Sequence, residues 1–205
     1  MEQPGRGKDD RVKRGEEFVK QIFRKLHKLG FLVAINGTEY THPKFIEHLR
    51  LSTDQTSLAI RFEPDGVIAW GEPPMTWYVE AKASDKIEKT AYEQYMKRQR
   101  EGNVLIVVFQ HRDIIYWQFI EQVEFINSNE YVNHYANPFP VIDGWIYPRR
   151  SQYWHDIKWD NPQASGTAYQ VVDMTSLRPW HTIKQVFMEQ LTREITHAPP
   201  LVPPV

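Results

Sequence analysis

The stretch EPDGVIAWGEPPMTWYVEAKAS, residues 63–84, decides the fold that we expect for this chain. Within TWYVEAKA, residues alternate as they do along a strand whose two faces meet different surroundings. One face of this strand carries Trp77, Val79 and Ala81, and the other carries Tyr78, Glu80 and Lys82. GEPPM predicts a turn and VIAW a preceding strand, so we expect a hairpin here.

The residues before the hairpin predict a helix followed by more strand. Apolar residues recur at helical spacing between Arg11 and Leu29, and Gly30 then predicts the end of that helix. Residues 31–56 give a mixed pattern that includes the short apolar stretch FLVAI. Alternation at Leu58, Ile60 and Phe62 predicts a strand, which EPDG interrupts and VIAW resumes.

The residues after the hairpin complete the pattern of an α/β fold. Residues 86–101 predict a second helix, ended by Gly102. VLIVVF at 104–109 is apolar on both faces, as in a central strand covered on two sides, and IIYWQFI at 114–120 is its expected neighbour. The order of helix, three strands, helix and two strands predicts a mixed central β-sheet flanked by helices.

The C-terminal third gives weaker signals. It is rich in turns and aromatic residues, and it predicts a strand in TAYQVVDM, a helix over 181–196 and an extended Pro-rich tail, APPLVPPV. With 205 residues, 41% of them hydrophobic, the chain is sized for one core. We therefore predict a single domain over 1–205, with a core at 11–126 and an aromatic-rich elaboration at 127–205.

Composition excludes several classes of protein and site. The sequence holds no apolar run of the roughly 18 residues that a membrane span needs, and its start lacks the apolar block of a signal peptide. We therefore expect a soluble, cytoplasmic protein without a membrane partner. The absence of Cys excludes disulfides, thiolate nucleophiles and Cys-built zinc sites. Any bound metal must be held by oxygen or imidazole.

The net charge of -1 hides an uneven distribution. Residues 1–28 hold nine Lys and Arg against five Asp and Glu, and residues 82–100 hold six against three. Residues 101–143 hold one against six. Two positive stretches are typical of a surface that faces a nucleic acid. They are equally typical of two solvated helices, and charge alone leaves both interpretations open.

Four residues of the hairpin favour metal chemistry. If its strands pair, Asp65 meets Glu80, while Ala81 turns to the core and leaves its carbonyl available. Two carboxylates and a carbonyl form an all-oxygen site suited to Mg²⁺ or Mn²⁺. With the ammonium of Lys82 on the same face as Glu80, the set suits phosphodiester hydrolysis. The alternative is an ordinary exposed Glu80–Lys82 pair on a sheet face.

These residues resemble those of the PD-(D/E)XK nucleases, a family of restriction-endonuclease-like fold that includes restriction enzymes and archaeal Holliday-junction resolvases. The match is residues 63–84, and the order of elements extends it over roughly 11–126. The resemblance implies that Asp65 and Glu80 are metal ligands and that Lys82 is the catalytic lysine. It also implies a restriction-endonuclease-like core.

Many members of that family add a glutamate from the first helix. In RGEEFVKQIFRKLHKLGF, residues 14–31, the position of that glutamate holds Val19, which is a departure from the pattern. Glu16 lies one turn earlier on nearly the same side, so we expect Glu16 to reach the metal instead. Glu17 points away and suits the first turn of a helix.

Two further groups of polar residues are candidates for substrate contacts. On the second helix they are Glu93, Gln94, Lys97 and Arg98, of which Gln94 and Lys97 resemble auxiliary residues of some family members. In the C-terminal third they are Arg149, Arg150, Tyr153, Trp154, Lys158 and Trp159, which interleave basic and aromatic side chains. Solvated faces and an aromatic core explain both groups as well.

The sequence therefore favours a Mg²⁺- or Mn²⁺-dependent endonuclease that acts on nucleic acid, with DNA favoured over RNA. One alternative is a non-catalytic nucleic-acid-binding or assembly module that keeps the fold, which Val19 favours. Another is a nuclease subunit that needs a targeting partner protein. A homodimer is also an expectation, because family members often need two active sites to cut two strands.

Overall fold

A six-stranded mixed sheet forms the centre of the molecule. The computed structural model describes residues 6–36, 54–72, 74–134, 139–147 and 168–197. The order of the strands is β1 (Leu32–Ile35), β2 (Gly66–Trp70), β3 (Met75–Lys82), β5 (Leu105–His111), β6 (Ile114–Phe119) and β10 (Arg178–Pro179). β3 and β5 run parallel, and the other neighbours are antiparallel. The predicted strands at 104–109 and 114–120 are confirmed as β5 and β6.

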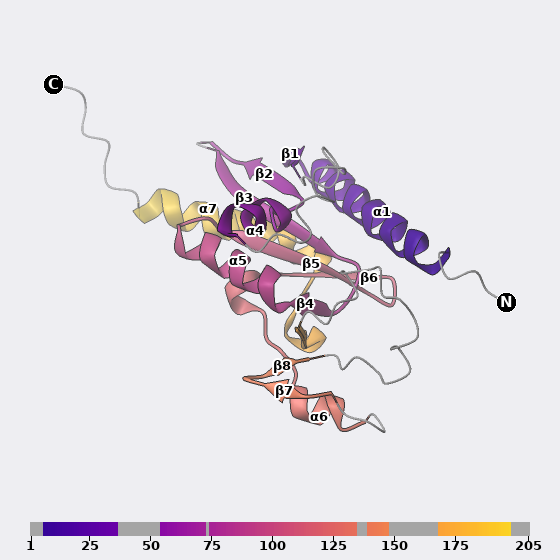
Figure 1. The fold of residues 1–205 in the computed structure, drawn as a ribbon. Coiled ribbons are helices and arrows are strands. Elements are labelled where there is room, and N and C mark those ends of the chain that lie inside the picture. The colour runs from indigo at the N-terminus through magenta and orange to yellow at the C-terminus, as the bar shows by residue number, and fades with distance from the viewer. Residues whose placement is uncertain (1–5, 37–53, 73, 135–138, 148–167, 198–205) are drawn as a thin grey trace.

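Helices cover both faces of this sheet, as the sequence predicts (Figure 1). α1 (Arg6–Lys28) and α7 (Ile183–His197) pack on one face, where Ile22 and Phe187 are buried with Val79 and Trp117 of the sheet. α5 (Lys89–Arg100) packs on the other face, where Tyr95 joins the core. β3 and β5 are therefore covered on both sides, which explains the unbroken apolar run of β5.

The strand predicted over residues 57–62 is wrong. These residues belong to the helix α4 (Gln55–Arg61), which Asp54 caps. The Asp54 carboxylate accepts the backbone N–H of Ser57 at 2.9 Å and its hydroxyl at 2.6 Å, and this cap favours a helix over an extended strand. The place beside β2 is taken instead by β1, which comes from the apolar stretch FLVAI.

A smaller four-stranded sheet lies beside the main one. Its order is β4 (Lys86–Glu88), β9 (Tyr169–Val171), β8 (Trp145–Ile146) and β7 (Val141–Ile142). Because β4 pairs with β9, the helix predicted over 86–101 begins only at Lys89. The strand predicted in TAYQVVDM is confirmed as β9. Shorter elements are α6 (Ser128–Val132) and the 3-10 helices η1 (Ile120–Gln122), η4 (Met174–Ser176) and η5 (Trp180–Thr182).

The C-terminal segments return to the main core. β10 pairs with β6, and the ring of Phe187 on α7 lies 4.4 Å from the ring of Trp77 on β3, centroid to centroid. The helix predicted over 181–196 is confirmed as α7. Part of the predicted elaboration over 127–205 is thus built into the main sheet and its core. Among the described residues, no helix is both long enough and apolar enough to span a membrane.

Candidate active site

The candidate site lies where the ladder between β2 and β3 ends. The last pair of this ladder joins Gly66 to Val79, and β3 continues along β5 through Glu80, Ala81 and Lys82. Asp65, directly before β2, turns its side chain into the place where the next ladder bond would lie. Its Oδ2 accepts the backbone N–H of Ala81 at 2.7 Å. A carboxylate therefore completes the hydrogen bonding of β3.

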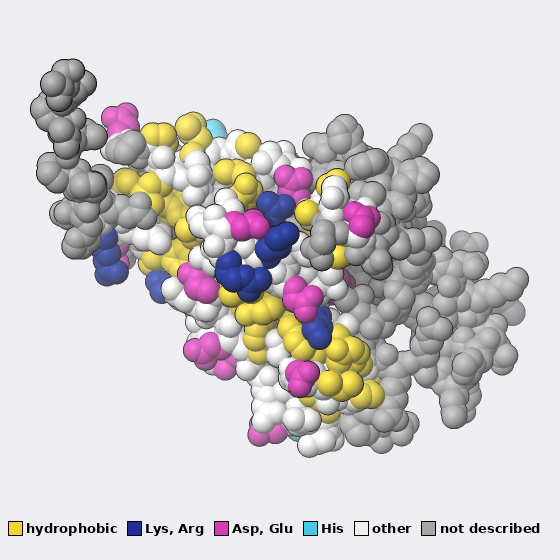
Figure 2. Space-filling view, turned by 60° about the vertical axis from the view of Figure 1, so that its left-hand side comes forward, with side chains coloured by type: hydrophobic (Ala, Val, Ile, Leu, Met, Phe, Trp, Pro, Cys, Tyr) yellow, Lys and Arg dark blue, Asp and Glu magenta, His cyan; other side chains and the backbone are white. Residues whose placement is uncertain are grey.

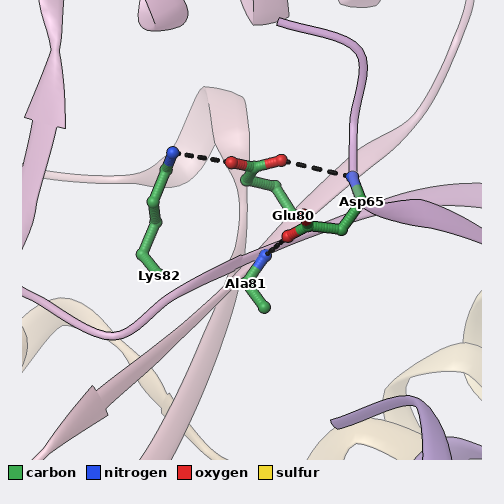
Figure 3. Close-up of polar contacts among 4 residues, drawn as sticks. All are labelled: Asp65, Glu80, Ala81 and Lys82. Carbon is green, nitrogen blue, oxygen red and sulfur yellow. Dashed lines mark hydrogen bonds and ion pairs between the residues drawn. The ribbon is translucent and has the colours of Figure 1, made fainter. Parts of the chain in front are cut away.

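Glu80 of β3 contacts Asp65 and Lys82 at the same end of the β2–β3 ladder (Figure 3). Its Oε2 accepts the backbone N–H of Asp65 at 3.3 Å, and its Oε1 lies 2.6 Å from Nζ of Lys82. Asp65 and Glu80 are 4% and 6% exposed. The alternative of an exposed Glu80–Lys82 pair is therefore wrong, because Glu80 is buried.

The predicted alternation along β3 is confirmed, and it directs the site to one face of the sheet. Val79 and Ala81 face the core beneath α1 and α7, whereas Glu80 and Lys82 face α5. The N–H of Ala81 points toward Asp65, and in an extended strand the C=O of a residue points to the same side as its N–H. The Ala81 carbonyl thus faces the Asp65 side and away from β5.

Gly66 lets the two strands come this close to α1. A Cβ at Gly66 would lie 2.6 Å from Cζ of Phe23 on α1 and closer still to the backbone oxygen of Ala34 on β1. A larger residue has no space between them. The glycine of EPDG is thus required by close packing, which fixes the start of β2 and the position of Asp65.

Lys82 carries its charge in an environment that favours it. Burial alone would lower the pKa of this ammonium, but the neighbouring Glu80, Tyr95 and Asp65 raise it well above its ordinary value. The ammonium also lies 5.7 Å from the centre of the Tyr95 ring. Lys82 therefore carries a positive charge at neutral pH in this arrangement.

Comparisons with known proteins give a distant likeness to solved structures. No model of a protein family matches the chain, and no curated protein matches it. Among solved structures, it is similar to Hjc of Archaeoglobus fulgidus, a Holliday junction resolvase from an archaeal hyperthermophile. The TM-score is 0.37 and the identity 17%, over 53% of this chain and 77% of that one.

The structure does not bring Glu16 into a group with the other two carboxylates. Glu16 is half-buried on α1, and the described part of the chain contains no cluster of three or more acidic or His side chains arranged to hold a metal. Val19, at the position of the family's helix glutamate, is 3% exposed and belongs to the core. Glu16 as a metal ligand stays a prediction.

The polar residues predicted along the second helix separate into two groups. Gln94 is 9% exposed, and Arg98 stacks on Tyr78 at 5.6 Å and donates to the Ala59 carbonyl of α4 at 3.3 Å. Glu93 and Lys97 are exposed, which fits a solvated face. The basic and aromatic residues predicted at 149–159 lie outside the described residues.

Sequence reasoning did not identify Tyr95 as part of the site. The side chain is 1% exposed, its ring centre lies 5.7 Å from Nζ of Lys82, and burial together with the neighbouring charge of Glu80 raises the pKa of its hydroxyl. A signal was present, because a Tyr on a buried helix face must find a partner for its hydroxyl. The sequence does not say which strand residue lies opposite.

Proposed function

We propose that this chain is a divalent-metal-dependent endonuclease of the PD-(D/E)XK type, with a restriction-endonuclease-like core, that hydrolyses phosphodiester bonds in DNA rather than RNA. The observation that carries the proposal is the convergence of Asp65, Glu80, Ala81 and Lys82 at the end of the β2–β3 ladder. Both carboxylates are buried, although a buried charge is costly and rare without a purpose in binding or pairing.

The donor set fits Mg²⁺ or Mn²⁺. These cations bind carboxylate and carbonyl oxygens, and Mg²⁺ typically uses one or two protein carboxylates and keeps several waters. We assign Asp65, Glu80 and the Ala81 carbonyl as ligands, and Glu16 as a further candidate from α1. When bound, such a cation supplies Lewis acidity toward a phosphoryl oxygen. Cys and imidazole ligands play no part in this assignment.

Lys82 supplies the positive charge of the chain itself. Because the surrounding acidic groups raise its pKa, it keeps its proton at neutral pH. An ammonium that is fixed in a poorly hydrated site stabilises the negative charge that develops on the phosphoryl oxygens during hydrolysis. We therefore assign Lys82 as the residue that stabilises the transition state, beside the metal ligands Asp65 and Glu80.

The exposed face of α1 supports a nucleic-acid substrate. Its exposed basic residues include Lys13, Lys20, Arg24 and Lys28, and Glu17 is the one exposed acid between residues 13 and 28. In the view of Figure 2, Lys and Arg side chains gather among Asp and Glu side chains, so that face of the molecule carries charges of both signs. A helix face of mainly one sign suits a phosphate backbone.

The direct test is incubation of the full chain with plasmid, single-stranded and branched DNA, and with RNA, in the presence of Mg²⁺ or Mn²⁺ or of a chelator. We expect metal-dependent cleavage of DNA. Asp65→Asn and Lys82→Met should each lower the rate by about a hundredfold or more, since removing one stabilising group usually costs that much. Lys184→Met, which removes an exposed lysine of α7, is the control. Cleavage that persists equally in all three variants would exclude the assignment.

One observation favours a second candidate, a nucleic-acid-binding or assembly module without turnover. Val19 is buried in the core at the position where the resembling family supplies a glutamate. This candidate predicts salt-sensitive binding of nucleic acid without cleavage in any divalent metal. Cleavage that appears only after a second protein is added would instead indicate a nuclease subunit that depends on its partner.

A further inference from the structure

The exposed side of α1 carries a line of basic side chains. These are Lys13, Lys20, Arg24 and Lys28, and successive members are seven, four and four residues apart. Because a helix turns once in about 3.6 residues, these spacings place the four side chains on one side of α1. We call the four residues the α1 stripe. At a rise of about 1.5 Å per residue, the α1 stripe is about 22 Å long.

No ion pair balances the charges of the α1 stripe among the residues whose side chains the structure describes. Lys28 lies in the last turn of α1, where the helix dipole favours a cation. Lys13, Lys20 and Arg24 lie before that turn, so the dipole does not account for them. Glu17 is the acidic residue exposed on the same side. The α1 stripe therefore presents mainly positive charge to solvent.

The buried side of α1 argues against a lipid surface as the partner. A helix that lies in a membrane interface inserts its apolar face among the lipids. In α1 that face includes Phe18, Ile22 and Leu26, which are buried against the central sheet. The side that remains for a partner is charged, and this suits a row of phosphate groups.

The α1 stripe and Lys82 lie on different sides of the central sheet. α1 packs on the face that carries Val79, whereas Nζ of Lys82 lies 5.7 Å from the centre of the Tyr95 ring of α5 on the other face. The stripe also points away from the sheet, because Arg24 lies about 200° around the helix from the buried Ile22. The thickness of one helix, about 10 Å, therefore separates the stripe from the sheet, and Lys82 lies beyond the sheet. A phosphate held by the stripe cannot also touch Lys82.

We propose that the α1 stripe binds the phosphate backbone of a nucleic acid at a place apart from the site of Lys82. The proposal rests on the proposed function in naming nucleic acid as the partner, but this binding needs neither a metal nor cleavage. A duplex carries one negative charge for about every 1.7 Å of its axis, so a stripe of about 22 Å can follow it past several phosphates. Such contacts release counterions and weaken as salt is added. The stripe thus adds affinity without recognising sequence.

The experiment measures binding of the full chain to a labelled DNA duplex and to a labelled single strand by fluorescence anisotropy, in EDTA and over a range of salt. Lys20→Gln/Arg24→Gln removes two charges from the middle of the α1 stripe and keeps residues of similar helix propensity. The slope of log affinity against log salt should become shallower by about 1.8 on the duplex or about 1.4 on the single strand, since each phosphate contact contributes about 0.9 or about 0.7. On the duplex, the loss of affinity between about 50 and 200 mM salt should then be about tenfold smaller than in the parent protein.

The matched control is Lys184→Gln/Arg193→Gln, which removes one Lys and one Arg that are exposed on α7, the other helix of the same sheet face. Both double variants change the net charge equally, so only a local contact distinguishes them. We expect the control to keep the slope of the parent. An unchanged slope in Lys20→Gln/Arg24→Gln would overturn the proposal, as would an equal reduction in the control. If circular dichroism shows that the first variant loses helix, Lys13→Gln/Lys28→Gln, at the two ends of the stripe, should give the same reduction.

The remaining outcomes separate this proposal from its rivals and from the proposed function. Binding to vesicles of phosphatidylcholine and phosphatidylserine, without binding to DNA, would assign the stripe to a lipid surface and overturn the proposal. Metal-dependent cleavage by a parent protein whose affinity Lys20→Gln/Arg24→Gln leaves unchanged would keep the proposed function and refute the role of α1. Binding that the variant weakens, in a parent protein that cleaves nothing in any divalent metal, would keep the role of α1 and refute the proposed function.

Discussion

Breaking the Lys82–Glu80 pair should destabilise the protein far more than replacing both partners. Nζ and Oε1 lie 2.6 Å apart, and the side chains of Lys82 and Glu80 are 25% and 8% exposed. At an effective dielectric constant of about 20, two unit charges at this separation attract by about 6 kcal/mol before the cost of burial is subtracted. That cost is several kcal/mol for each ion, so the net contribution of the pair is small.

The expected effects of the variants follow from which charge remains. Lys82→Met leaves the buried carboxylate of Glu80 without its ammonium and should cost about 3–5 kcal/mol of the free energy of unfolding. Glu80→Gln should cost less, because the more exposed Lys82 can turn toward water. The double variant removes both charges, and its stability should lie within about 1 kcal/mol of the parent or above it.

Urea unfolding of the metal-free protein at neutral pH, followed by circular dichroism, measures these differences. Lys97→Met, at an exposed position, should change stability by no more than about 0.5 kcal/mol. The reasoning is refuted if the two single effects add in the double variant to within about 0.5 kcal/mol, the limit for independent sites. It is also refuted if Lys82→Met unfolds at the same urea concentration as the parent.

Three further predictions concern the packing, the metal and the pH dependence. In urea unfolding, Gly66→Ala should destabilise the protein by about 1–3 kcal/mol or more, because the added methyl group overpacks the core. Gly15→Ala, at an uncrowded helix position, should instead stabilise it by about 0.5–1 kcal/mol. Mg²⁺ should raise the thermal midpoint of the parent protein and leave that of Asp65→Asn unchanged. Hydrogen bonds from Thr175 lower the pKa of Asp173. The ionised Asp173 side chain should therefore add a small amount of stability above about pH 4, and this amount should be lost on acidification. Unfolding curves should accordingly show a difference between the parent and Asp173→Asn at pH 7 that is smaller at pH 3.

The faces of β3 were predictable because side chains along a strand alternate between two faces, so placing one residue places all of its neighbours. Once Trp77 and Val79 face the core, Glu80 and Lys82 must share the opposite face. The hairpin then requires Asp65 to come near Glu80, and the hydrogen bond at 3.3 Å is the outcome. Local pattern was sufficient here because each step depends on residues close together in sequence.

The strand predicted over 57–62 failed because three alternating apolar residues are too few to exclude a helix. Leu58, Ile60 and Phe62 fit a strand by period, but the cap at Asp54 lies just outside that window. The hydrogen bonds from Ser57 to Asp54 give the local chain a helical start. An Asp three residues before a Ser was the signal to weigh against the alternation.

Tyr95 could not be assigned to the site from sequence for a different reason. Helical spacing identifies the buried face of α5 but not the strand residues beneath it, because that depends on how the helix lies across the sheet. Tyr95 and Glu80 are 15 residues apart and meet only after β3 and β5 pair in parallel. The charge partners of a buried side chain are a property of the packed fold.

The end of the β2–β3 ladder explains why buried charge is tolerated at this point. β2 stops pairing at Gly66, where α1 and β1 leave no space for a side chain, while β3 continues along β5. The backbone N–H of Ala81, which β2 no longer pairs with, needs an acceptor, and the Asp65 carboxylate supplies it. The N–H of Asp65 in turn binds Glu80. The same hydrogen bonds that complete the backbone therefore hold two carboxylates side by side, so an apolar replacement of either would leave a buried N–H without a partner.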